Sequence, residues 1–179
     1  ATAATGVTGV CGSGIIEVIA EMYLAGVINQ DGVIDGRLAQ RSDRIVADGR
    51  TFSYVLHRGD VPMQITQNDV RAIQLAKAAL HAGIRLLMDH LGVERVDRIG
   101  LAGAFGSHID PKYAMVLGMI PDCALDRVAS VGNAAGAGAR IALLDATART
   151  AIEDLVRRVE KIETAIEPRW FGAEELPAE

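Results

Sequence analysis

The stretch Leu101-Ala102-Gly103-Ala104-Phe105-Gly106 begins within a short apolar run, residues 96–102, and four of its six residues are Ala or Gly. The apolar run predicts a buried β-strand. Glycine adopts positive φ easily and lets a ligand approach the main chain closely, so residues 103–106 predict a tight turn after that strand. In open α/β sheets, ligands bind beyond the carboxyl ends of strands. This turn is therefore the first candidate for a binding site.

Regular elements are predicted on both sides of this turn. A long helix is expected over residues 67–91, with Thr66 as its N-cap and Asp69 in the capping-box position. Its apolar residues recur at helical spacing and predict one buried stripe, formed by Ile73, Ala76, Leu80, Ile84, Leu87 and Leu91. The remaining predicted elements are strands at 1–10, 44–47, 51–57, 63–66, 127–131 and 162–166, with helices at 15–25, after Asp110-Pro111, and at 134–146 and 149–161.

Two further turns between a predicted strand and a predicted helix are built from small residues, at Cys11–Gly14 and at Gly132–Asn133. Free backbone N–H groups at a helix start favour anions. None of the three turns matches a G-x-x-x-x-G-K-[ST] or G-x-G-x-x-G fingerprint. Their convergence on one pocket is a prediction from topology, and the ligand is left open at this point.

Composition restricts the class of protein. The 179 residues suit one domain, half of them are hydrophobic, and the formal net charge is −5 with the basic residues scattered. Nucleic acid is therefore not an expected partner. No apolar run reaches the length of a membrane helix, and no signal peptide is expected. Two isolated cysteines indicate a reducing, cytoplasmic location. Because the sequence begins inside a predicted strand, we expect a fragment of a longer multidomain protein.

The order of elements, and four stretches within it, resemble a known family. The stretches are Gly-Val-Cys-Gly-Ser-Gly-Ile-Ile at 9–16, Ile-Thr-Gln-Asn-Asp-Val-Arg-Ala-Ile-Gln-Leu-Ala-Lys-Ala at 65–78, Leu-Ala-Gly-Ala-Phe-Gly at 101–106 and Val-Gly-Asn-Ala-Ala-Gly-Ala-Gly-Ala at 131–139. The series resembles the C-terminal lobe of the actin, Hsp70 and sugar-kinase (ASKHA) superfamily. Within it, the sequence is most similar to the reductive activators of corrinoid proteins.

This resemblance implies an α/β fold: a ribonuclease H-like, actin-type ATPase lobe with a mixed sheet and helices packed on it. Residues 1–179 would form a single C-terminal nucleotide-binding lobe. ATP and Mg²⁺ would be cofactors of the parent protein, and a [2Fe–2S] cluster would belong to the parent only, because the C-x₄-C-x₂-C spacing is missing here. The implied partners are a corrinoid protein or corrinoid-dependent methyltransferase and the other domains of the same polypeptide.

The resemblance also implies roles for individual residues. Residues Gly103, Ala104, Phe105 and Gly106 would form the turn that receives adenosine, with Ala104 where the superfamily usually has a second glycine. Gln74 and Lys77 on the long helix, and Asn133 at the start of a later helix, would face the base or ribose. Gly12, Ser13 and Gly14 are candidates from the small-residue turn alone. No catalytic residue or metal ligand is assigned, because the paired Asp-Gly phosphate turns are absent from this sequence, and the isolated chain is expected to be inactive.

Two alternatives stay open. The chain could be the lobe of another actin-like kinase for a sugar or an acyl group, or a non-catalytic interaction domain that has lost the nucleotide. The small residues of 134–146 permit close helix packing, so a homodimer or a lobe interface is compatible with the last alternative.

Overall fold

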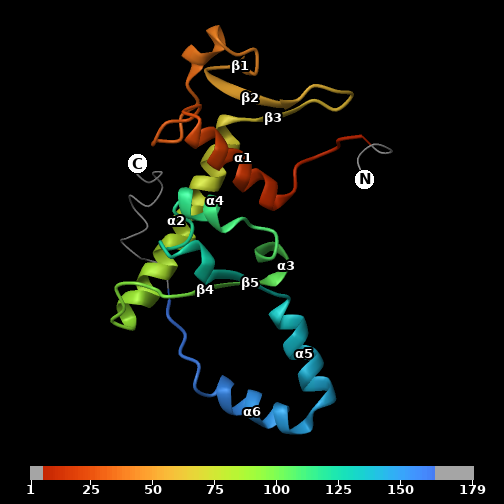
Figure 1. The fold of residues 1–179 in the computed structure, drawn as a ribbon, viewed down its shortest axis with the longest axis vertical. Coiled ribbons are helices and arrows are strands. Elements are labelled where there is room, and N and C mark those ends of the chain that lie inside the picture. The colour runs from red at the N-terminus through yellow and green to blue at the C-terminus, as the bar shows by residue number, and fades with distance from the viewer. Residues whose placement is uncertain (1–5, 164–179) are drawn as a thin grey trace.

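The computed structural model describes residues 6–163 (Figure 1). The long helix α2 runs through the middle of the molecule, a small antiparallel sheet lies at one end of it, and the last two helices extend away beyond the other end (Figure 1). The elements are α1 (Gly12–Leu24), η1 (Gly36–Gln40), β1 (Ile45–Asp48), β2 (Thr51–His57), β3 (Met63–Ile65), α2 (Gln67–His90), β4 (Ile99–Ala102), α3 (Gly103–Gly106), α4 (Pro111–Val116), η2 (Leu125–Arg127), β5 (Val128–Gly132), α5 (Ala134–Leu144) and α6 (Ala146–Val156).

Local sequence signals define the start of α2 as expected. The Thr66 hydroxyl accepts the backbone N–H of Asp69 at 3.1 Å, and the Asp69 carboxylate accepts the backbone N–H of Thr66 at 2.8 Å. These reciprocal hydrogen bonds satisfy two N–H groups that the helix itself cannot pair. The predicted capping box is therefore confirmed, and Gly92 follows the helix with a φ of 64°.

The predicted buried stripe of α2 is wrong for four of its six residues: Ile73 and Ile84 are partly buried, but Ala76 and the three leucines are exposed. Leu80, Leu87 and Leu91 are 43%, 50% and 72% exposed. The buried positions are instead Val70, Gln74, Lys77, Ala78, Ala82 and Met88. Small alanines and two polar side chains make up much of this buried face, so hydrophobicity does not mark it in the sequence. Periodicity finds an apolar face, but the neighbouring elements decide which face of the helix is covered.

The antiparallel strands β1 and β2 correspond to the strands predicted at 44–47 and 51–57. β1 pairs with β2 from Ile45–Tyr54 to Asp48–Thr51, so the connecting loop consists of Gly49 and Arg50, and Gly49 has a φ of 59°. Glycine with positive φ at the first position of a two-residue loop suits the twist of the two strands. β3 adds to the other edge of β2.

The parallel strands form a second sheet. β4 pairs with β5 from Ile99–Val128 to Ala102–Gly132. Within residues 6–163, antiparallel and parallel strands thus occur in two separate sheets rather than in one mixed sheet. Residues 6–10 were expected in a strand and lie in none, and the predicted strand at 162–166 is absent from 162 and 163, while 164–166 lie outside the described residues.

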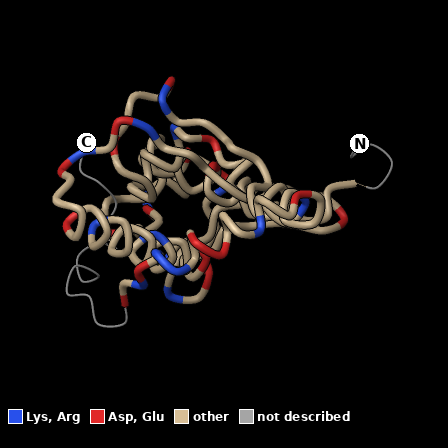
Figure 2. Tube along the Cα trace, turned by 90° about the horizontal axis from the view of Figure 1, so that it is seen from below, with Lys and Arg blue, Asp and Glu red and all other residues tan. Residues whose placement is uncertain are grey.

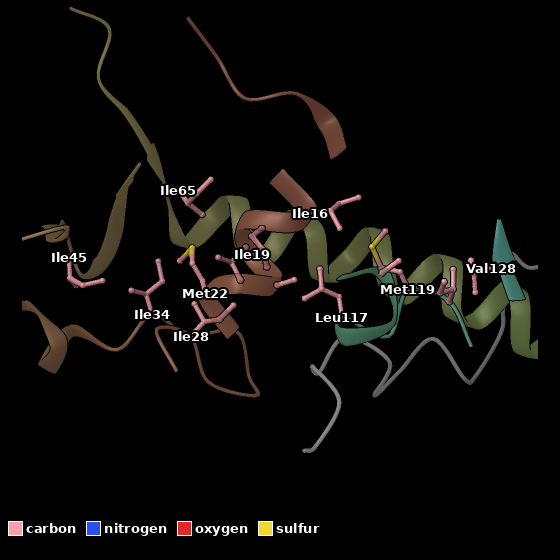
Figure 3. Packing of buried hydrophobic residues seen from close by; sticks show 14 residues of the cluster. Ile16, Ile19, Met22, Ile28, Ile34, Ile45, Ile65, Leu117, Met119 and Val128 are labelled. Carbon is pink, nitrogen blue, oxygen red and sulfur yellow. The ribbon is translucent and has the colours of Figure 1, made fainter. Parts of the chain in front are cut away.

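One apolar core connects the antiparallel sheet to the parallel one (Figure 3). Ile19 and Met22 of α1 lie among side chains from the loop and strands at the hairpin end (Figure 3). Leu117 after α4 and Val128 of β5 extend the cluster along α2 (Figure 3). Because burying each such side chain stabilises the fold by roughly 1.5–3 kcal/mol, this core fixes α1 and β5 relative to one another.

Helices α5 and α6 confirm the two predicted C-terminal helices. Each is shorter than predicted, and α6 begins at Ala146 instead of at residue 149. Asn133 caps α5 and Asp145 caps α6 through their side-chain oxygens. None of the residues within these two helices is buried. They pack chiefly on each other.

Lys and Arg are interspersed with Asp and Glu along the described part of the trace (Figure 2). Among the described helices, none combines the length and the apolar character needed to cross a bilayer.

Candidate functional site

The candidate site begins where the two parallel strands end. Ala102 of β4 pairs with Gly132 of β5, so Gly103 and Asn133 follow immediately at the same edge of the sheet. Residues 103–106 were expected to form a tight turn and form instead one helical turn, α3. The Ser107 hydroxyl closes this turn by donating to the carbonyl of Gly103 at 2.8 Å.

Two glycines leave the main chain open at this edge. Gly103 and Gly132 have φ values of 101° and 68°, and apart from the adjacent residues and the backbone of α3, no described atom lies within 4 Å of the place where a Cβ would be. Ala104 and Asn133 beside them are exposed. Gly106 serves packing within the chain instead, because a Cβ there would lie 3.3 Å from the backbone of Leu101. A Cβ would therefore be unobstructed at Gly103 and at Gly132, and a ligand contact at this edge of the sheet stays a prediction.

Phe105 links this edge to the start of α1. A Cβ on Gly12 would lie 2.5 Å from the Phe105 ring, which is 53% exposed. The ring thus covers Gly12, the first residue of α1, and any larger residue at position 12 would occupy the space of the ring. Together with the pairing of Ala102 and Gly132, this contact brings all three small-residue turns into one neighbourhood, as the topology predicted.

Cys11 and Ser13 organise the first of these turns. The Cys11 sulfur accepts the backbone N–H of Gly14 at 3.4 Å and lies 3.4 Å from the Ser13 hydroxyl. The hydrogen bond with Ser13, followed by that from Gly14, lowers the pKa of the Cys11 thiol. Ser13 is buried, so its hydroxyl is used inside the turn. Whether Gly12, Ser13 or Gly14 contacts a ligand stays a prediction.

The side-chain amide oxygen of Asn133 is used in a helix cap. Its Oδ1 accepts the backbone N–H of Gly136 at 2.9 Å and thereby caps α5. A Cβ on Gly136 would lie 2.6 Å from the Asn133 amide, so the glycine makes room for the cap. The Nδ2 group of this exposed side chain can donate to a molecule placed at the strand ends.

Gln74 and Lys77 have surroundings that differ from the expectation. Their residues are 3% and 4% exposed, whereas the resemblance implied polar groups facing a nucleotide. Gln74 Nε2 donates to the carbonyl of Asp31 at 3.0 Å, and its amide lies directly against Gly32. It also lines a cavity of about 500 Å³ that includes Arg50. The nucleotide contacts of Gln74 and Lys77 stay predictions.

Gln67 is a positioning residue that sequence reasoning missed. Its Nε2 donates to the carbonyl of Gly32 at 2.7 Å, and its Oε1 accepts the backbone N–H of Ile34 at 3.0 Å. Both backbone partners are more than 30 residues earlier in the chain, so no local pattern could have identified them. This amide fixes the loop against which Gln74 packs.

The described residues offer no evident metal centre. In the range 6–163, no group of three or more His, Cys, Asp or Glu side chains could hold an ion.

Known proteins are similar to this chain in sequence and fold. Residues 2–173 match the family model described as the C-terminal domain of RACo, the ASKHA domain. A curated relative, "Corrinoid activation enzyme RamQ" from Eubacterium limosum, is 33% identical over 174 residues, which cover 90% of this chain and 29% of the relative. A solved structure titled "Reductive activator for corrinoid,iron-sulfur protein" is 29% identical, with a TM-score of 0.84, and the match covers 94% of this chain and 28% of the other.

This chain therefore spans less than a third of the length of either relative. The match of the family model over nearly all residues confirms the expected fold class and resemblance: the chain belongs to the family of C-terminal ASKHA domains of RACo.

Proposed function

We propose that this chain is the lobe of a longer protein that contributes the adenosine side of an ATP site, and that the longer protein reductively activates corrinoid proteins. The observation that carries the first part is the open glycine backbone at the paired ends of β4 and β5, where a Cβ on Gly103 or Gly132 would meet no atom from another part of the described chain within 4 Å. The second part is supported by the names of the two relatives.

The roles of the residues follow from their positions. The main chain at Gly103 and Ala104 would lie against the nucleoside, because neither residue has a bulky side chain to exclude it. Asn133 would donate from Nδ2 to the base or ribose while its Oδ1 continues to cap α5. Phe105 would hold the start of α1 beside the site through its contact with Gly12. Hydrolysis of the bound nucleotide supplies free energy, and we assign neither that step nor a Mg²⁺ ligand to these residues.

The wider function would depend on movement between lobes. A nucleotide held between two lobes stabilises the closed arrangement by its differential affinity for it. That closure would couple ATP turnover to docking of the corrinoid protein and to electron transfer from a [2Fe–2S] cluster elsewhere in the polypeptide. We place the protein in the cytoplasm, where free thiols such as Cys11 and Cys123 persist.

A binding experiment tests the nucleotide assignment. Isothermal titration with ATP and with ADP is carried out on the longer protein and on variants of it. We expect Ala104→Leu to weaken binding at least tenfold, because the larger side chain fills the space beside Gly103. The matched control, Ala76→Leu, adds the same side chain to an exposed position of α2 and should leave affinity unchanged. Equal weakening in both variants, or an unmodified protein that binds no adenine nucleotide, contradicts the proposal.

A further inference from the structure

A cavity of about 540 Å³ is lined by residues of α1, β2 and α4. Tyr54 and Leu56 are two positions apart, so they lie on the same face of β2. Tyr113 supplies the wall from α4. Cavities that hold small organic ligands have volumes of about 300–1,000 Å³. Of the three small-residue turns, only the first borders this cavity, through Gly14, so it is separate from the ends of β4 and β5.

The face of α1 that lines the cavity carries two carboxylates. Glu17 and Glu21 are four residues apart, so they are neighbours on the helix surface and repel each other. Among the described residues that line the cavity, none is basic. No ion pair within residues 6–163 includes either carboxylate. A cation placed between them would remove this repulsion.

The Tyr113 ring adds to the negative character of the cavity wall. Its hydroxyl donates to a carboxylate oxygen of Glu21. This hydrogen bond, followed by burial and by the charges of Glu21, Asp110 and Glu17, raises the pKa of Tyr113. The ammonium of Lys112, which does not line the cavity, lies 5.3 Å from the centre of the same ring. The ring face is therefore able to attract a cation.

We propose that this cavity binds a small amphipathic organic cation. Its ammonium or guanidinium head would lie at Glu17 and Glu21, and its apolar body would lie against Met22 and Leu56, which are buried and half-buried. The site is additional to the proposed nucleotide site and does not depend on it.

The other classes of ligand fit this cavity less well. An anion would be repelled by both carboxylates, and a neutral apolar molecule would take water from the half-buried Glu17 without giving it a partner. A metal ion is not favoured either, since within residues 6–163 no group of three or more His, Cys, Asp or Glu side chains could hold one. A single basic side chain of a partner protein would supply the head, but it would leave much of the volume unfilled.

A ligand-observed NMR titration of the longer protein that contains these residues tests the proposal. The probe is n-hexylammonium, and n-hexanol is its neutral counterpart of similar shape. We expect the ammonium to bind at least about fivefold more tightly than the alcohol, because the carboxylates are only partly exposed. Glu17→Gln and Glu21→Gln should each reduce this preference, and the double variant should abolish it. The matched control Glu153→Gln removes the same charge from an exposed position of α6 and should leave the preference unchanged.

Three outcomes would overturn the proposal. The first is equal affinity for the two probes. The second is a preference that neither single variant reduces, with circular dichroism showing that both are folded. The third is tighter binding of N-acetyl-lysinamide than of n-hexylammonium, which would assign the cavity to a side chain of a partner protein. Titration of the same samples with ATP keeps this site apart from the proposed function, because a protein that binds ATP without preferring the ammonium refutes only the cation site.

Discussion

The face of α2 that supports the fold can be tested by truncating one residue from each of its two apolar faces. Val70 is fully buried and Leu80 is 43% exposed. Val70→Ala removes two methyl groups worth about 0.8 kcal/mol each, and the residual cavity adds to this cost. Alanine regains roughly half a kcal/mol in helix propensity. We therefore expect a net loss of about 2 kcal/mol in the free energy of unfolding.

Leu80→Ala removes a larger side chain but should cost less. A fully buried Leu→Ala change costs about 2.7–5 kcal/mol, and a side chain that already meets water over nearly half its surface should lose about 1 kcal/mol. Urea unfolding of this chain at 25 °C, followed by circular dichroism, measures both values. A Leu80→Ala cost equal to or above that of Val70→Ala would refute the orientation of α2 and restore the stripe expected from periodicity.

Three further predictions concern the ends of the helices. Gly12→Ala should displace the Phe105 ring, measured as changed NMR shifts of that ring, and unchanged shifts would contradict the contact. The pKa of Cys11 is lowered chiefly by its hydrogen bond with Ser13, so its thiol should react with iodoacetamide faster at pH 7 than an ordinary thiol. Ser13→Ala should slow this reaction, and equal rates in the two proteins would exclude the hydrogen bond as the cause. Hydrogen bonds within its cap, above all from Thr147, lower the pKa of Asp145. The stabilisation of α6 by this carboxylate is therefore present above about pH 4 and is lost as the pH falls through the folded-state pKa. An α6 helicity that stays constant by NMR from pH 6 to pH 2 would contradict this prediction.

Elements whose determinants lie within a few residues were predicted well from the sequence. The start of α2 depends on two side chains three positions apart, and the turn between β1 and β2 depends on Gly49, which has a positive φ. The proximity of Gly103 and Asn133 was also predictable, because the carboxyl ends of neighbouring parallel strands share one edge. These inferences need no knowledge of distant contacts.

Contacts between distant segments could not be predicted in the same way. The Phe105 ring against Gly12 joins residues more than 90 positions apart, and no property of either residue indicates the other. Gln67 presents the same difficulty, since an amide at the first position of a helix is usually exposed. The family resemblance implied that Gln74 and Lys77 face a nucleotide, and the burial of both side chains could not be read from the sequence.

The misassigned stripe of α2 and the exposed faces of α5 and α6 have one physical origin. Apolar residues at helical spacing indicate that a face will leave water, because burial of that surface lowers the free energy. They do not indicate which surface buries it. In α2, this chain covers the face of Val70 and Ala78 and leaves Leu87 half exposed, and in α5 it covers neither Leu143 nor Leu144. Helical spacing therefore predicts that a face is buried, whereas the contacts of distant segments decide which face that is.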